Sequence, residues 1–436
     1  MQIIERMPSR RFAFAIALAV LIGSRSAAAL GPAGTEIDTS DYTIDLHQGP
    51  LTASSRVIGL AGTIAPITEG VEGLAVNPAS VAMRVPWSRS WVDGELDFGF
   101  TRPASITGSD FDNNGDDGFA NNAAAFVNAG ACIQLGAWGI GLRMDVGQYR
   151  VQARDPATSV TTSELSVSLM RSNVVAAYSF GHGELVLGYG VAISSVELDL
   201  PAVDASEAEL EASVEGFAMQ LGAVWAPHHL PLRAGVGVRF PVSDTETPPE
   251  GVVPDDQGDY VAQGYYFPRE IRIPAELHLA LAVQWFRPLN VAWHDPDDAK
   301  APLDPSQKGR RARENRLLIA AALTVTGPVK NGVGVESFFS QAVERSGRRM
   351  SWSPRLGVEG EPLAGGLLLR AGTYLEPTRF DTSSPRPHAT AGFDVHVPVA
   401  WSVFGLFDDD TTFRVGGALD SAERYFAWTA SLGIWR

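Results

Sequence analysis

The chain has 436 residues, of which 45% are hydrophobic and 19% are charged, and its formal net charge is −16. This composition excludes a disordered chain and leaves enough material for one large β domain or two ordinary domains. The acidic balance argues against nucleic acid as a partner. Cys132 is the single cysteine, so the chain has no intramolecular disulfide framework.

Residues 1–29 have the pattern of a secretory signal peptide. Three arginines precede an apolar run from Phe12 to Gly23, and the small residues Ala27 to Ala29 form a cleavage pattern. The apolar run reaches only about 18 Å into a hydrocarbon layer of roughly 30 Å, so a membrane anchor is the weaker interpretation. Cleavage after residue 29 would remove four arginines and one glutamate and change the net charge from −16 to −19.

The next segment, residues 30–88, is rich in small residues, and its stretch from Gly73 to Pro86 has neither a helical nor a strand periodicity. Pro78 fixes its own φ and biases Asn77 toward extended backbone geometry. The Asn77 side chain can in turn bond backbone groups two residues on, which closes a turn. We therefore predict a compact turn at Asn77, Pro78 and Ala79. A surface turn with no role is the alternative.

The first clear strand pattern runs from Trp91 to Thr101. Alternate residues are apolar, and the residues between them include three acidic side chains. Such alternation predicts a β-strand with one apolar and one polar face. The apolar face comprises Val92, Gly94, Leu96, Phe98 and Phe100, and the polar face comprises Asp93, Glu95, Asp97 and Thr101.

The stretch after this strand begins like a calcium-binding loop. Oxygen ligands stand at the spacing of such a loop, with a glycine at its sharp turn: Asp110, Asp112, Asn114, Gly115 and Asp116. The twelfth position holds Asn121 instead of a bidentate glutamate, and no helices are expected on either side, which excludes an EF-hand. We predict a looser Ca²⁺ site in this first long loop, with a solvated acidic loop as the alternative, and expect no other cofactor.

A later strand, from Glu164 to Phe180, changes its apolar face partway along. The apolar residues are odd-numbered up to Leu169 and even-numbered from Val174 onward. Because side chains alternate along a strand, such a shift predicts a β-bulge between the two halves. We place this bulge at Met170, Arg171, Ser172 and Asn173.

Similar alternating segments recur to the end of the chain, about sixteen in all, or 14 if short ones are merged. Long polar connections, such as residues 102–122 and 295–314, alternate with tight turns, such as residues 136–139 and 327–332. This asymmetry is typical of outer-membrane barrels. Trp138, Trp225, Trp285 and Trp435 fall at the short-turn ends of strands, where an interfacial aromatic girdle would lie.

A sheet that spans a membrane must close into a barrel. In lipid every backbone N–H and C=O group must be paired internally, so an exported sheet without helices is stable there only as a closed barrel. We predict an all-β fold, a transmembrane antiparallel β-barrel of about 14 (14–16) strands formed by residues 89–436. Strand arginines such as Arg143, Arg233 and Arg370 are then expected to face the lumen, because charge is costly on the lipid face.

The stretch from Ser54 to Trp87 is glycine- and alanine-rich, carries intermittent acidic residues and leads to an Asn-Pro-Ala triplet just before the first strand; the matching positions are Gly59, Ala61, Gly62, Glu69, Gly70, Glu72, Asn77, Pro78 and Ala79. It resembles the N-terminal signature of the FadL-type long-chain fatty-acid transporter family. Residues 370–380 and 388–397 are similar to late strands of FadL-like barrels. The resemblance implies that residues 30–88 form a hatch inside the barrel, seated by the triplet. It also implies a kinked strand beside a lateral exit, for which the bulge at Met170 to Asn173 is the candidate.

We therefore expect a non-enzymatic outer-membrane protein that takes up hydrophobic small molecules, such as long-chain fatty acids, by binding and lateral release. The expected partners are outer-membrane lipid, the hydrophobic ligand and the barrel-assembly machinery. Two alternatives stay open at this point. The chain could instead be a structural or secretion-associated outer-membrane barrel that scaffolds surface proteins, or a secreted soluble β protein, which could be an enzyme.

Overall fold

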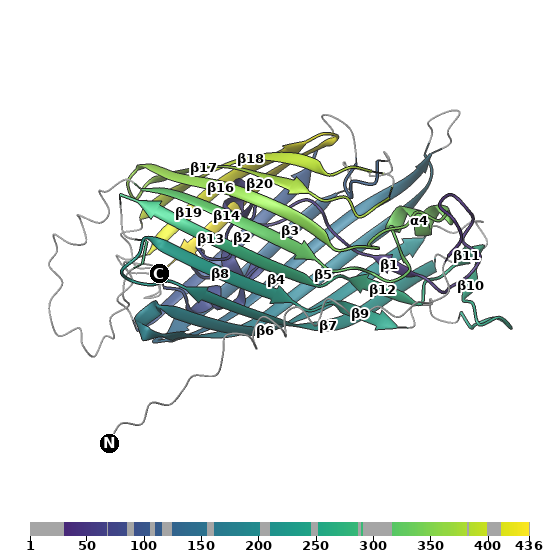
Figure 1. Ribbon diagram of the computed structural model, residues 1–436, viewed down its shortest axis with the longest axis horizontal. Helices are drawn as coiled ribbons and strands as arrows, with labels where there is room; N and C mark the ends of the chain where they lie inside the picture. Colours follow the sequence, from purple (N-terminus) through teal and green to yellow (C-terminus); the bar gives the residue numbers. More distant parts are fainter. Residues whose placement is uncertain are drawn as a thin grey trace, which may run out of the picture.

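The structure, a computed structural model, describes residues 30–67, 69–84, 91–104, 110–115, 124–154, 161–200, 210–245, 252–286, 289–290, 316–381, 383–398 and 411–435. Fourteen of its strands form one closed antiparallel barrel (Figure 1). The barrel closes between its first and last strands, where Glu95 lies opposite Trp435. The predicted β-barrel is confirmed, and the strand number is 14.

The barrel strands differ widely in length. The four longest follow the first hairpin in the chain and are neighbours in the barrel. In chain order the fourteen are β2 (Val92–Pro103), β3 (Ala125–Leu135), β4 (Trp138–Arg154), β5 (Thr161–Phe180), β6 (Leu185–Leu200), β7 (Leu210–Trp225), β8 (Leu232–Arg239), β13 (Glu276–Trp285), β14 (Leu317–Thr326), β16 (Ser351–Leu363), β17 (Leu367–Glu376), β18 (Arg386–Pro398), β19 (Thr412–Ala422) and β20 (Tyr425–Trp435).

β2 has the predicted alternation, with its apolar face outside and its acidic face inside. The side chains of Leu96 and Phe98 are 54% and 45% exposed, whereas Asp93, Glu95 and Asp97 are buried. Outward apolar side chains continue this belt around the barrel: Ile140, Leu142, Val174, Leu187, Leu281, Leu369, Phe393, Val415 and Leu432. A closed barrel with an apolar outer belt is suited to a lipid bilayer, and this favours a membrane protein over a secreted soluble one.

One end of the barrel, which we call the turn end, carries tight turns and exposed tryptophans. The turns at residues 136–137 and 181–184 join strands there. Trp138, Trp225 and Trp285 lie at this end and are exposed, as the sequence predicted for an aromatic girdle. We call the opposite end the mouth end.

The predicted alternation of long and tight connections is wrong at two places. Trp285 pairs with Leu317, so the connection that contains residues 295–314 joins strands at the turn end, not at the end of the other long loops. Residues 327–332 open a long connection at the mouth end. Strand direction, which reverses at every connection, determines the end at which a loop lies, and loop length alone does not. Residues 295–314 themselves lie outside the described residues.

β5 runs without a bulge at Met170 to Asn173, so that prediction is wrong. Both ladders pass through these residues without a shift, since Val146 pairs with Met170 and Arg143 with Asn173, and the pairing with β6 is equally regular. Odd-numbered residues point inward all along the described part of the strand. The apolar face changes because the surroundings change. The barrel interior is apolar toward the mouth end, whereas the outer surface is apolar toward the turn end.

Residues 51–67 and 69–84, which we call the lumenal segment, lie inside the barrel. The segment contains α2 (Ser55–Gly59) and two 3-10 helices, η1 (Glu72–Ala75) and η2 (Pro78–Ala82), and most of its residues are buried. η2 packs against β3 to β7, and α2 packs against β17 to β20, on the face opposite the apolar belt. None of the helices within the described ranges is long and apolar enough to cross a membrane.

A small second sheet covers the mouth end, at the right in Figure 1. Its strand order is β15 (Gly332–Val333), β1 (Thr43–Asp45), β12 (Glu270–Ile273) and β9 (Val242–Thr245). β1 comes from the N-terminal part of the chain and runs parallel to both neighbours, which belong to two different connections of the barrel. The hairpin of β10 (Val261–Ala262) and β11 (Tyr265–Tyr266) and the helix α4 (Val335–Ser340) lie at the same end.

The apolar belt yields a prediction on β5. An arginine in place of Val174, which faces outward and is 52% exposed, should destabilise the folded barrel in lipid vesicles by about 2–4 kcal/mol. An arginine in place of Ser166, which faces outward nearer the mouth end, should cost at most about 1 kcal/mol. Urea unfolding of both variants in vesicles measures the difference. Equal costs would contradict the placement of the belt.

Candidate functional site

The Asn77 side chain organises the turn that leads into β2. Its Oδ1 accepts the backbone N–H of Ala79 at 3.0 Å and so caps η2, with Pro78 as the first helical residue. This is the bond to a residue two positions on that the sequence predicted. Its Nδ2 donates to the carbonyl oxygens of Ala65 at 2.8 Å and of Ala223, on β7, at 3.2 Å. One buried amide therefore joins two parts of the lumenal segment to the barrel wall.

Glycines in the wall allow this turn to approach the backbone of the strands. A Cβ atom added at Gly188 on β6 would overlap the backbone of Ala79, and one added at Gly222 on β7 would overlap Oδ1 of Asn77. A larger residue at either position would push η2 away from the wall. The wall and the Asn-Pro-Ala turn are thus shaped for each other.

Buried ion pairs hold η1 against the opposite side of the wall. Arg414 on β19 contacts Glu72 at 2.6 Å and Asp97 on β2 at 2.5 Å. Glu72 also accepts a hydrogen bond from Ser54 Oγ at 2.6 Å. Both carboxylates are almost fully buried, so Arg414 neutralises them where water cannot.

A second set of pairs starts from α2. Arg56 lies 3.5 Å from Glu69 and 3.5 Å from Glu359 on β16. Glu69 is in turn bound by Arg233 on β8 at 2.9 Å, and Glu359 by Arg370 on β17 at 2.6 Å. The inward direction predicted for Arg233 and Arg370 is confirmed. These arginines are paired with carboxylates of the lumenal segment and of the wall.

Arg414 provides a direct test of this network. Replacing it by Met should destabilise the protein by about 3–5 kcal/mol, because Glu72 and Asp97 would remain buried without a cation. A triple variant that also carries Glu72→Gln and Asp97→Asn should recover most of that loss in a urea unfolding measurement. Arg348→Met is the control, since its pair with Asp381 is more than half exposed and should contribute less than about 1 kcal/mol. A triple variant as unstable as the single one would contradict the network.

The four residues predicted as a lateral exit do not form one site. Met170 points outward and is 43% exposed, and Ser172 shares its face, while Arg171 and Asn173 point into the barrel. Asn173 accepts a hydrogen bond from Gln220 Nε2 at 2.5 Å and is part of the polar interior. The strand pairing on both sides of Met170 to Asn173 is also regular, so the barrel wall has no opening between strands at these residues.

The predicted calcium loop packs against α4 instead of standing in solvent. Asp110 accepts the N–H of Gly115 at 3.2 Å and lies 4.0 Å from Arg386. Asn114 donates to Glu336 of α4. Asp116 lies outside the described residues, and the described residues contain no group of three or more potential ligands arranged around a metal ion. Calcium binding stays a prediction.

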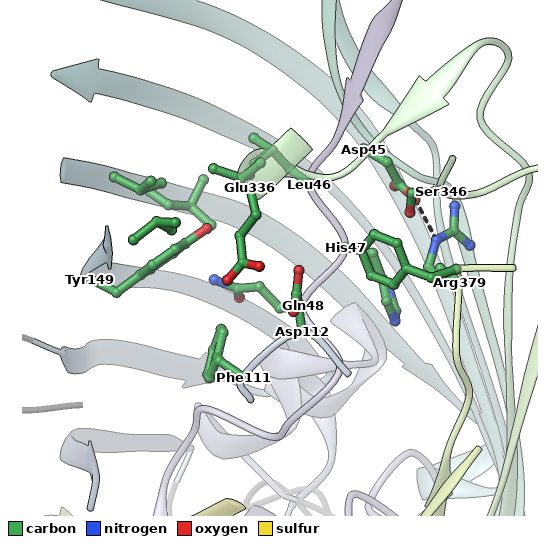
Figure 2. Close-up of a pocket in the computed structure, with 15 residues that line it drawn as sticks. Asp45, Leu46, His47, Gln48, Phe111, Asp112, Tyr149, Glu336, Ser346 and Arg379 are labelled. Carbon is green, nitrogen blue, oxygen red and sulfur yellow. Dashed lines mark hydrogen bonds and ion pairs between the residues drawn. The ribbon is translucent and has the colours of Figure 1, made fainter. Parts of the chain in front are cut away.

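A cavity lies between this loop, α4, the barrel wall and the chain just after β1 (Figure 2). Its free volume is about 30 Å³, well below the roughly 150 Å³ that holds a benzene ring. A hydrophobic ligand therefore needs side chains to move. The lining residues are Asp45, Leu46, His47, Gln48, Phe111, Asp112, Tyr149, Val151, Val167, Leu169, Val335, Glu336, Ser346, Arg379 and Phe380.

The cavity belongs to the large apolar cluster that fills the mouth half of the barrel. This cluster joins inward residues of β4 to β7 with β1, α4 and the mouth sheet. Leu165, Val167 and Leu169 of β5 are part of it. The change of apolar face in β5 is therefore the sequence signal of this apolar interior and not of a bulge.

Several charged or titratable groups line the cavity. Arg379 is already engaged, since its Nε donates to Asp45 at 2.6 Å, its Nη1 to Ser351 Oγ and its Nη2 to the carbonyl oxygen of Gly327. Burial and the nearby Glu336 raise the pKa of Asp112 well above its usual value. Burial and Arg379 lower the pKa of His47 to about 4, so this imidazole is neutral at neutral pH.

Comparison with known proteins agrees with the architecture. No protein-family model and no curated protein matches the chain. Solved structures do match. A FadL homologue from Pseudomonas aeruginosa is 12% identical over 88% of this chain and 98% of its own, with a TM-score of 0.52.

The Ralstonia pickettii toluene transporter TbuX is 12% identical over the same shares, with a TM-score of 0.50. A TodX deltaS2S3 mutant, a monoaromatic hydrocarbon channel, is 13% identical over 88% of this chain and 98% of its own, with a TM-score of 0.53. At these identities the likeness concerns the fold. The chain has the fold of the FadL-type barrels, as the stretch from Ser54 to Trp87 predicted.

Proposed function

We propose that the chain is an outer-membrane barrel for the passive uptake of hydrophobic small molecules. The observation that carries the proposal is the apolar interior of the mouth half, in which inward residues of four strands pack with the mouth sheet. A water-filled pore has a polar lining, whereas a hydrophobic molecule gains free energy from apolar contacts along its route. The fold shared with a toluene transporter and a hydrocarbon channel supports the same class of cargo.

In this proposal residues 30–88 are the hatch and residues 89–436 the barrel. The hatch blocks free diffusion, because the lumenal segment is bonded to several sides of the wall. Export would depend on the signal peptide, residues 1–29, and membrane insertion on the barrel-assembly machinery. Residues 1–29 lie outside the described residues. Binding and movement along an apolar route need no catalytic group, so we propose a transporter and not an enzyme.

Two details of the expected function, the identity of the cargo and its lateral release, differ in their support. Long-chain fatty acids stay one candidate cargo within the proposed class. Release sideways into the membrane would need an opening in the wall other than the one expected at Met170 to Asn173, where the strand pairing is regular.

Uptake can be tested with a matched pair of substitutions on β5. Val167→Asp places a charge in the cavity, and Ser168→Asp places the same charge on the outer face of the next residue. Cells with Val167→Asp in the outer membrane should take up labelled toluene about tenfold more slowly than the wild type, because a buried unpaired carboxylate repels apolar cargo. Ser168→Asp should match the wild type. Equal uptake by both variants and by cells without the protein would refute the proposed function.

The hatch can be tested separately from transport. Replacing Asn77 and Pro78 with Ala leaves the carbonyl groups of Ala65 and Ala223 without their donor, at a cost of about 1–3 kcal/mol. We expect this variant to leak bulky antibiotics that the wild type excludes, measured as lower inhibitory concentrations. Pro254→Ala, in an exposed part of a connection, is the control. Unchanged permeability in a correctly assembled barrel would show that Asn77, Pro78 and Ala79 form an ordinary turn that does not seat the hatch.

A further inference from the structure

A second pocket lies beside the mouth sheet, at the end of the barrel shown at the right in Figure 1. Its volume is about 540 Å³, against about 30 Å³ for the cavity in Figure 2, and the two have no lining residue in common. Pockets of about 300–1,000 Å³ are the size that holds small organic ligands. This pocket is therefore large enough for a ligand without any movement of its walls.

Three separate parts of the chain form the pocket: residues 41–43, the connection between β9 and β13, and residues 330–331. Hydrogen bonds fix these parts to one another. Asp259 Oδ1 accepts the N–H of Ser40 at 2.7 Å, and the N–H of Arg269 donates to the carbonyl oxygen of Ser40 at 3.1 Å. Asn331 Nδ2 donates to the carbonyl oxygen of Asp41 at 3.2 Å. A pocket held in this way loses little conformational entropy when a ligand binds.

Two cations of the lining are available to a ligand. Arg272 lies 3.6 Å from Glu270 and is balanced by it. Arg269 donates from Nη2 to the carbonyl oxygen of Gly258 at 3.1 Å but has no ion pair with a described residue. Lys330 is exposed and has neither a hydrogen bond nor an ion pair within the described part of the chain. In a chain with a net charge of −16, this pair favours an anionic ligand group, which would form charge-assisted hydrogen bonds.

A free acceptor stands in the same lining. The carboxylate of Asp41 has no hydrogen bond or ion pair to any residue that the structure describes. It would repel a plain anion, but it can accept hydrogen bonds from hydroxyl groups. An apolar molecule would remove Asp41, Arg269 and Lys330 from water without giving them partners, which is costly. The lining therefore suits a ligand that carries both an anionic group and hydroxyl donors.

From this arrangement we infer that the pocket binds a phosphorylated sugar, with its phosphate on Arg269 and Lys330 and its hydroxyl groups on Asp41. A phosphate monoester carries a charge of about −1.5 to −2 at pH 7, which matches the two cations. The ligand is either a free sugar phosphate or the phosphorylated sugar of a glycolipid in the surrounding membrane. The inference does not rest on the proposed uptake, because the pocket is separate from the apolar interior.

Isothermal titration of the full-length protein in phospholipid nanodiscs tests the inference with glucose 6-phosphate, glucose and inorganic phosphate as probes. Glucose 6-phosphate should bind at least about tenfold more tightly than either of the others, because it alone engages the cations and Asp41 together. Arg269→Gln and, separately, Lys330→Gln should each weaken its binding about tenfold. Asp41→Ala should weaken glucose 6-phosphate about threefold and strengthen inorganic phosphate, since it removes a hydroxyl acceptor and a repelling charge.

Arg348→Gln is the control variant. Arg348 is exposed, pairs with Asp381 and does not line the pocket, so this variant should bind all three probes like the wild type. Empty nanodiscs supply the blank.

Nanodiscs that also contain lipopolysaccharide distinguish the two sources of the ligand. If glycolipid sugars fill the pocket, glucose 6-phosphate should bind about tenfold more weakly in these discs, whereas unchanged binding identifies a free sugar phosphate. Glucose or inorganic phosphate binding as tightly as glucose 6-phosphate would overturn the inference. Binding that survives both Arg269→Gln and Lys330→Gln would also overturn it. No binding of any probe would overturn it too, and would leave the proposed uptake of hydrophobic molecules standing.

Discussion

The contact on which the rest of the structure depends is the ion pair that joins the lumenal segment to the wall through Arg414, Glu72 and Asp97. A barrel in lipid must place its apolar side chains outward, so its charged side chains gather inside. Buried charges are tolerated only in pairs. The lumenal segment takes part in this pairing, because Glu72 binds Arg414, Glu69 binds Arg233 and Arg56 lies 3.5 Å from Glu359.

The barrel has two regions of opposite polarity along its axis. A β-strand crosses the hydrocarbon core in about 9–11 residues, whereas β5 has 20. The part nearer the turn end is apolar outside, as Val174 shows, and its interior contains buried polar groups such as Asn173 beside an apolar cluster with the lumenal segment. The part nearer the mouth end stands beyond the apolar belt, where a polar outer face meets water and an apolar interior can form. The cavity exists because these long strands extend past the membrane.

This division also explains which features the sequence could predict. β2 lies in one region, so its alternation gave the correct faces, and the Asn77 turn was predictable because its capping bond is local. β5 crosses both regions, and a single rule for its apolar face failed at Met170. The cavity residues could not be predicted, because Asp112, Tyr149 and Glu336 come from a loop, a strand and a helix that only the closed barrel brings together.

The path of the N-terminal part of the chain links the mouth sheet to the lumenal segment. β1 is held at the mouth end by β12 and β15, and the chain then passes through Asp45 to Gln48, which line the cavity, into the lumenal segment. β2 follows this segment in the chain and pairs with β20, which closes the barrel around the described residues of the lumenal segment. Residues 45–48 of the cavity wall are therefore also the covalent connection between the mouth sheet and the lumenal segment. Any ligand that displaces residues 45–48 must move one or both of them.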